Sequence, residues 1–181
     1  MSAYKPMAVH LETERLSMQP WAEPDAGELC ALVCERGSRT TVERCREAIA
    51  SGLAKTAVTG LAVLPIRRRD EGDFIGYCGL IVGRSTAEEP EIAYELLRRA
   101  HGRGYATEAA HAMLRLGFEG LGLHRIVARV DERNEPSVKL ARRLGMRQEA
   151  RLVHNEFFKG EWSTEVDFAM LAGEWYRLAR R

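Results

Sequence analysis

The sequence predicts an α/β (α+β) fold in which helices cover both faces of one mixed sheet. Two observations lead to this fold class. Strand-like apolar runs alternate with segments of helical periodicity along the chain, and no internal repeat or flexible linker interrupts their order. The length of 181 residues suits one domain, residues 1–181. A chain of this size buries about 70% of its unfolded surface, so one hydrophobic core is feasible.

The first half of the chain is predicted to contain a strand, two helices and a hairpin. Apolar and polar residues alternate over residues 10–19, which favours a strand. Apolar residues recur at helical spacing over residues 24–34, and a second helix is expected from residue 42 to about residue 54. The hairpin strands are two apolar runs, residues 59–66 and 74–82. The charged segment between them, from Arg67 to Asp73, has the length of a solvated turn.

The second half repeats the alternation of strand and helix. An apolar strand from Glu91 to Leu97 precedes a helix whose apolar face runs from Ala106 to Leu121 in steps of three and four residues. The remaining elements are predicted in order as a strand at residues 125–130, a helix from about residue 136 to 144, and strands near residues 146–153 and 166–171. These bring the expected strands to about seven.

A glycine-rich turn between that strand and that helix is the most informative local feature. Gly102 and Gly104 can adopt backbone angles that are closed to other residues, and they place no side chain in the way of a ligand. Successive amide groups can therefore converge on an anion at the start of the helix, where the helix dipole adds roughly half a positive charge. Arg98, Arg99 and Arg103 surround this turn. The pattern is typical of a pyrophosphate site.

The turn resembles the Q/R-x-x-G-x-G/A signature of the GCN5-related N-acetyltransferase (GNAT) superfamily, with Arg99, Gly102 and Gly104 at its fixed positions. Asn134 and Ser137 resemble the N-x-x-S of the ribosomal-protein N-terminal acetyltransferase branch. The resemblance implies a mostly antiparallel sheet whose fourth and fifth strands splay apart, and acetyl-CoA (coenzyme A) as the acyl donor. It also implies contacts to this cofactor from Leu96, Leu97, Arg98, Arg99, Gly102, Arg103, Gly104, Tyr105, Ala106, Thr107, Asn134 and Arg142.

The same resemblance implies catalytic roles. Ser137 would protonate the departing thiolate, and a Leu96 amide would stabilise the oxyanion. Glu156 ranks first as the general base because of its spacing from Ser137, and Glu91 and Glu95, with His154 behind them, are alternatives. A base is needed because only a neutral amine can attack the thioester. At pH 7 about one lysine amine in 2,500 and roughly one α-amine in ten is neutral. Residues 35–41 and 154–163 would form the acceptor-side walls.

The composition of the chain limits the classes of partner that we expect it to bind. With 27 basic and 26 acidic residues, the chain has no global charge that favours nucleic acid. No apolar run is long enough to span a membrane, so a cytoplasmic location is expected. No C-x-x-C pair occurs, so no metal is expected. The predicted partner is an amine acceptor, either a protein N-terminus or a small molecule, and a homodimer is left open. The alternatives are a non-catalytic acyl-CoA-binding module and a nucleic-acid-binding domain.

Overall fold

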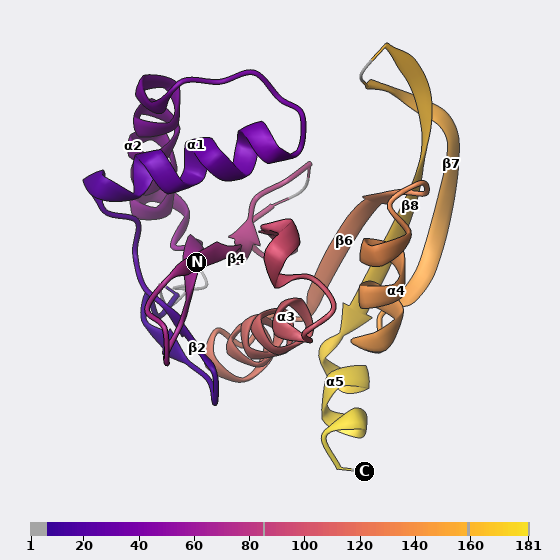
Figure 1. Cartoon of the computed structure of the whole chain (residues 1–181). Helices are drawn as coiled ribbons and strands as arrows, with labels where there is room; N and C mark the ends of the chain where they lie inside the picture. The colour runs from indigo at the N-terminus through magenta and orange to yellow at the C-terminus, as the bar shows by residue number, and fades with distance from the viewer. Residues whose placement is uncertain (1–6, 85, 159, 181) are drawn as a thin grey trace.

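The computed structural model describes residues 7–84, 86–158 and 160–180. Within these residues the chain forms one eight-stranded sheet with the strand order β1-β2-β3-β4-β5-β6-β8-β7. Neighbouring strands are antiparallel except β5 and β6, which are parallel. Helices α1 and α2 lie on one side of the sheet and α3 on the other (Figure 1). The predicted mixed, mostly antiparallel sheet is confirmed.

The elements before the middle of the chain follow the predicted order. They are β1 (Leu11–Glu12), β2 (Leu16–Met18), the short helix η1 (Glu23–Asp25), α1 (Ala26–Glu35), α2 (Val42–Thr59), β3 (Val63–Arg68) and β4 (Phe74–Ile81).

The elements after the middle carry the glycine-rich turn and the long C-terminal hairpin. They are β5 (Glu91–Leu96), η2 (Arg98–Ala100), α3 (Tyr105–Arg115), η3 (Leu116–Gly120), β6 (Arg125–Asp131), α4 (Glu135–Arg143), β7 (Arg147–Phe158), β8 (Glu161–Leu171) and α5 (Ala172–Leu178).

Two N-terminal predictions need correction. The single strand expected at residues 10–19 is a tight hairpin of β1 and β2, in which the Thr13 amide donates to the Leu16 carbonyl at 2.9 Å. This turn raises the strand number from about seven to eight. Helix α2 continues beyond residue 54 to Thr59 and ends at Gly60, whose φ of 72° reverses the chain. The next strand therefore starts at Val63 and not at residue 59.

The C-terminal strands are also longer than predicted. Of residues 154–163, which were expected to form an acceptor-side wall, residues 154–158 belong to β7 and residues 161–163 to β8. The hairpin projects beyond the rest of the molecule (Figure 1), and its residues 151–157 are exposed. Residues 151–157 of β7 do not show the alternation of a half-buried strand, because both faces of β7 meet solvent there, whereas Ser163 and Glu165 of the neighbouring β8 are buried.

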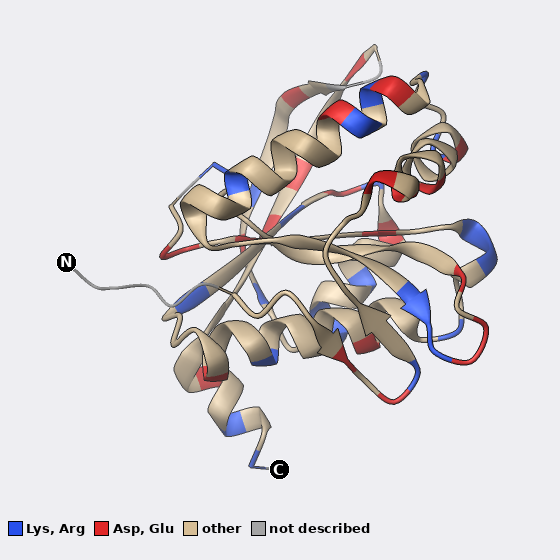
Figure 2. Ribbon diagram, turned by 90° about the vertical axis from the view of Figure 1, so that its left-hand side faces the viewer, with Lys and Arg blue, Asp and Glu red and all other residues tan. Residues whose placement is uncertain are grey.

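Helix α3 packs on the middle of the sheet and forms the centre of the core. Ala109, Ala110, Met113 and Leu114 are fully buried, at the three- and four-residue steps that the sequence indicated. None of the helices in the described part of the chain combines the length and the apolar character that crossing a bilayer requires. Basic and acidic residues are interspersed along the ribbon in the view of Figure 2.

Candidate active site

Strands β5 and β6 diverge from a single point of contact. They pair only where Glu91 lies opposite Val127, and the Val127 amide donates to the Pro90 carbonyl at 3.0 Å. The Leu97 amide donates to the Ile75 carbonyl of β4 at 2.9 Å. Because successive residues of a strand direct their amides to opposite edges, the Leu96 amide faces the open edge toward β6. The predicted splay of the fourth and fifth major strands is confirmed.

A cleft of about 670 Å³ opens where these strands part. It lies between the end of α1, the end of β5, the glycine-rich turn and the first turns of α3 and α4. The residues predicted from sequence that line it are Glu95, Leu96, Arg98, Gly102, Gly104, Tyr105, Ala106, Thr107, Asn134 and Ser137. The volume is within the range of about 300 to 1,000 Å³ that is typical of small-molecule sites.

The glycine-rich turn has the geometry that an anion site requires. Gly102 and Gly104 have φ values of 73° and 80°, and no atom lies within 4 Å of a Cβ built on Gly102. Gly104 is the N-cap of α3 and supplies no capping side chain, so the first amides of the helix remain available. Open space in front of uncapped helical amides fits the diphosphate of coenzyme A.

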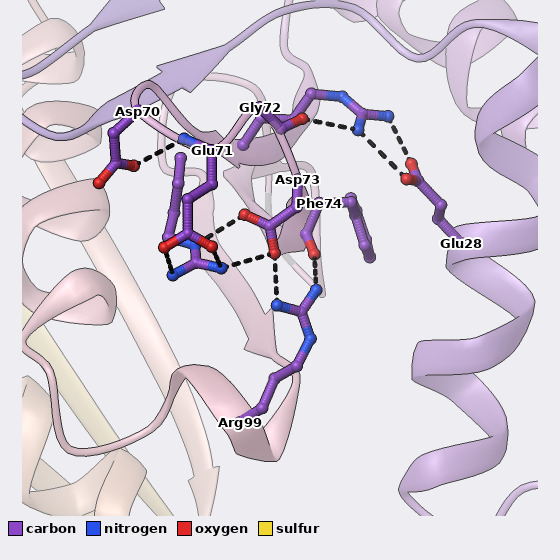
Figure 3. A network of polar contacts seen from close by, with 9 residues as sticks. Glu28, Asp70, Glu71, Gly72, Asp73, Phe74 and Arg99 are labelled. Atoms are coloured by element: carbon purple, nitrogen blue, oxygen red, sulfur yellow. Dashed lines mark hydrogen bonds and ion pairs between the residues drawn. The ribbon is translucent and has the colours of Figure 1, made fainter.

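The arginines around the turn have different roles. Arg98 lines the cleft. Arg99 is directed away from it and donates to the Asp73 carboxylate and the Phe74 carbonyl, as Figure 3 shows. Arg103 lies in the turn but is not one of the residues that line the cleft. Arg99 therefore ties the turn to the start of β4 and does not reach into the cleft.

Asp73 also holds Arg68, which the sequence placed in a solvated loop. Arg68 is only 8% exposed and donates to Asp73 at 2.7 Å. Hydrogen bonds from Arg68, and then from Arg99, outweigh the effect of burial and lower the pKa of the Asp73 carboxyl to about 2. This end of the predicted charged loop is therefore an ordered ion-pair network.

A second network anchors the turn to the N-terminal hairpin. The Arg15 guanidinium pairs with Glu108 in the first turn of α3 at 2.6 Å and donates to the Arg103 carbonyl at 3.0 Å. Burial acts to raise the pKa of Glu108, but hydrogen bonds from Thr13 and Arg15 outweigh it and hold this pKa below its usual range. Arg15 could not be predicted as part of the site, because nothing in the local sequence pattern links it to a helix about 90 residues later.

The start of α4 lies across the cleft from the glycine-rich turn. Asn134 Oδ1 accepts the Ser137 amide at 3.3 Å, which is the helix cap that the sequence indicated, and both residues line the cleft. Arg142 is directed to Gln148, 3.4 Å away, and it is Arg143 that lines the cleft. At this end of α4 the arginine in the cleft is therefore one residue later in the chain than expected.

Tyr94 is a further hydroxyl in the cleft that the sequence analysis did not select. It lines the cleft together with Ser137, and its hydroxyl lies 3.5 Å from the Ser137 carbonyl. Burial raises the pKa of Tyr94, so its phenol stays protonated at neutral pH. It is a second candidate to donate a proton in this part of the cleft.

The three candidate carboxylates occupy different environments. Glu95 lines the cleft and accepts from Arg36 at 2.8 Å and from the Tyr77 hydroxyl at 3.0 Å. Glu91 is at the far end of β5, paired with Arg129 at 2.8 Å. Glu156 is exposed on β7 and is not one of the cleft-lining residues. The structure therefore brings Glu95, and neither Glu91 nor Glu156, to the cleft.

Two further hydrogen bonds join residues that line the cleft. The Glu35 carboxylate, at the end of α1, accepts the Arg98 amide at 2.6 Å. His101 Nε2 lies 2.9 Å from the Leu96 carbonyl oxygen, and because a carbonyl only accepts, Nε2 carries the proton. Of the wall expected at residues 35–41, Glu35 and Arg36 do line the cleft.

Comparisons with known proteins agree with this geometry. A family model for the acetyltransferase (GNAT) domain matches residues 15–147. The uncharacterized N-acetyltransferase p20 of Bacillus licheniformis is 30% identical over 175 residues, which cover 91% of this chain and 97% of p20. The uncharacterized N-acetyltransferase YnaD of Bacillus subtilis (strain 168) is 35% identical over 118 residues, which cover 61% of this chain and 65% of YnaD.

A solved structure supports the same fold. RimL, the ribosomal L7/L12 alpha-N-protein acetyltransferase in complex with coenzyme A, superposes with a TM-score of 0.78 over 91% of this chain and 97% of RimL, at 16% identity. At this identity the likeness shows the fold alone. The family model, in contrast, spans most of the chain and includes both halves of the cleft. The chain therefore belongs to the GNAT family and is an N-acetyltransferase of that family.

Proposed function

We propose that this protein transfers an acetyl group from acetyl-CoA directly to a primary amine, on a protein N-terminus or a small molecule. The observation that carries the proposal is the convergence of an unpaired strand edge, a glycine-rich helix start and a carboxylate on one cleft. Acetyl-CoA supplies a thioester, which an amine attacks at its carbonyl carbon. The roles that follow are those of the protein's own residues.

The donor would lie along the open edge of β5. The amides of the glycine-rich turn and of α3 would bind its diphosphate, with Arg98 and Arg143 close by. The Leu96 amide faces the same edge and would donate to the thioester oxygen as negative charge develops there. Removal of one oxyanion donor costs about 3 to 4 kcal/mol of catalysis in other enzymes. Glu35 must release the Arg98 amide for the donor to pair with it.

Two proton transfers complete the reaction. The amine must lose a proton as the C–N bond forms, and Glu95 is the described carboxylate best placed to receive it, directly or through water. The thiolate must gain a proton as the C–S bond breaks, and Ser137 and Tyr94 present hydroxyls in that part of the cleft. None of these steps requires a covalent acyl-enzyme.

An acceptor screen with the purified protein tests the proposal. Free thiol is followed after addition of acetyl-CoA and a panel of amines that includes N-terminal peptides, lysine, polyamines and aryl amines. Acetyl-CoA should bind, measured by calorimetry, and at least one amine should release thiol well above the rate without acceptor. Binding without turnover by any amine would favour the alternative, a non-catalytic acyl-CoA-binding module.

A further inference from the structure

A second cavity, of about 410 Å³, lies between α2 and the sheet. One wall is a face of α2 that includes Ala48, Ile49, Gly52 and Leu53, and the opposite wall is formed by β3, β4 and the segment before β3. The lining is mainly apolar. The second half of α2 contributes to this character, because Lys55 is its one charged residue after Glu47 (Figure 2). We call this cavity the α2 groove.

The α2 groove adjoins the cleft on its acceptor side. Tyr77 and Ala93 line the groove, and Tyr77 donates through its hydroxyl to Glu95, which lines the cleft. Ala93 and Glu95 are two residues apart on β5 and so share one face of the sheet. The groove is therefore within reach of a substituent on an amine that lies beside Glu95, along the face that Tyr77 and Ala93 share.

The chemical character of the α2 groove favours one kind of substituent on the acceptor amine. Its apolar walls favour a hydrocarbon group, because burial of such a group removes apolar surface from water. Among the described residues, Lys55 is the one charged residue that lines the groove. Its ammonium group repels a second cationic end, which counts against a polyamine in this position. The volume suits one aromatic ring or branched chain together with its linker.

We infer that the acceptor is a primary amine with an aromatic or branched hydrocarbon group, and that the α2 groove binds this group while Glu95 faces the amine. The inference rests on the proposed function and adds the class of acceptor to it. The same chemistry occurs in a free arylalkylamine and in a peptide whose first residue is large and apolar. The experiment below separates these two sources.

The first measurement compares kcat/KM for ethylamine, 2-phenylethylamine and spermidine. A hydrocarbon group that fills a complementary pocket raises kcat/KM by about tenfold or more, so the phenyl compound should exceed ethylamine by at least that factor. Spermidine should be no better than ethylamine. Phe-Gly-Gly and Gly-Gly-Gly amides form the peptide arm, and a preference for Phe there alone would assign the peptide source. Equal values for all amines would overturn the inference and leave the acetyltransferase proposal intact.

Variants that fill the α2 groove test whether the preference for the phenyl compound arises there. No atom lies within 4 Å of a Cβ built on Gly52, so Gly52→Leu fits, and leucine also has the higher helix propensity. The ratio of phenyl to ethyl kcat/KM should fall about tenfold in Gly52→Leu and in Ala48→Leu. Gly27→Leu is the matched control, because Gly27 is an equally uncrowded glycine in α1 that lines neither cavity, and it should keep the ratio. An unchanged ratio in both groove variants would overturn the assignment.

A binding measurement keeps the inference testable if no amine is acetylated. Trp21 lines the groove, so 2-phenylethylamine should change its fluorescence in a saturable way without acetyl-CoA. The change should be absent in Trp21→Phe and weakened in Gly52→Leu. Saturable binding without turnover would reject the acetyltransferase proposal and retain the groove. Absence of any saturable change in the wild-type protein would reject the groove itself.

Discussion

The Arg15 guanidinium pairs with the Glu108 carboxylate at 2.6 Å and so connects the N-terminal hairpin to the first turn of α3. The same guanidinium donates to the carbonyl of Arg103, inside the glycine-rich turn. Because the Arg103 carbonyl lies between Gly102 and Gly104, this contact holds the backbone from which the proposed diphosphate amides project.

Replacing Arg15 with alanine should therefore weaken acetyl-CoA binding. A hydrogen bond to a charged group contributes about 1.5 to 3 kcal/mol, so KM for acetyl-CoA should rise about tenfold while kcat changes less. Steady-state rates at varied acetyl-CoA measure this. Arg69→Ala is the control, because Arg69 donates to Thr13 in the same hairpin without touching the turn. Equal effects of the two variants would reduce Arg15 to a general stabiliser of the hairpin.

The glycine-rich turn should not tolerate a β-branched residue. Gly104 has a φ of 80°, so Gly104→Val strains the backbone and adds bulk where the amides must approach phosphate. Acetyl-CoA should raise the melting temperature of the wild-type protein and leave that of the variant unchanged. Gly122→Val carries similar backbone strain at a φ of 69°, far from the cleft, and should retain the full shift. A full shift in Gly104→Val would refute the assignment of the turn.

The features that the sequence predicted correctly depend on local pattern. The apolar steps along α3 and the glycines before it are contained in about twenty consecutive residues. The helix, its turn and one side of the cleft could therefore be predicted from them. Asn134 shows its capping role in the same way, because the helix that it caps begins at the next residue.

The features that were missed depend on contacts between distant segments. Arg15 and Glu108 are 93 residues apart, and Arg36 and Glu95 are 59 apart, so no periodicity could pair them. The spacing of Glu156 from Ser137 does not show where either residue lies in space, and the structure has Glu95 in the cleft and Glu156 exposed on β7, so the identity of the base stays a prediction. Arg142 and Arg143 are adjacent in α4, and the helical pattern of the sequence does not show which of the two side chains points into the cleft.

Substitution of Ser137 by alanine tests which hydroxyl protonates the thiolate. A general acid contributes about 100- to 10,000-fold, so Ser137→Ala should lower kcat by at least 100-fold with little change in acetyl-CoA affinity if Ser137 is that acid. Tyr94→Phe is the matched variant, because it removes the other hydroxyl near the same backbone. Rates and calorimetry on both variants separate them. A normal kcat for Ser137→Ala together with a loss for Tyr94→Phe would transfer the role to Tyr94.

Asp73 should make stability depend on acid pH. Its pKa is lowered to about 2, so its carboxylate stabilises the folded state above about pH 4, and this contribution is lost as pH falls toward 2. Because the side chain is 29% exposed, solvent screening limits the effect to about 1 to 2 kcal/mol. Urea unfolding from pH 7 to 3 should show Asp73→Asn less stable than wild type above pH 5, with the difference narrowing below pH 4.

The control for this measurement is Asp70→Asn. Asp70 is exposed and, within the part of the chain that the structure describes, accepts from the Glu71 amide alone, so its replacement should change stability little at any of these pH values. A constant difference between wild type and Asp73→Asn over the whole range would mean that the Asp73 interaction does not depend on ionisation.

The position of the general base predicts a pH signature. Glu95→Gln should suppress the rate at neutral pH by about 100-fold or more and recover part of it as pH approaches the pKa of the acceptor amine, because an amine that is already neutral needs no base. Glutamine keeps the size of the side chain, so contacts to Tyr77 and Arg36 change least. Profiles of kcat/KM against pH for wild type and variant measure the effect.

The same profiles for Glu91→Gln and Glu156→Gln distinguish the alternatives. Glu91 is held by Arg129 away from the cleft and Glu156 is exposed on β7, so both variants should follow wild type within a few fold at every pH. A selective loss in Glu156→Gln at neutral pH, with Glu95→Gln unaffected, would show that the β7–β8 hairpin moves over the cleft when the acceptor binds. If all three variants followed wild type, deprotonation would have to come from water or from the acceptor itself, and an acceptor with a low pKa would then be expected.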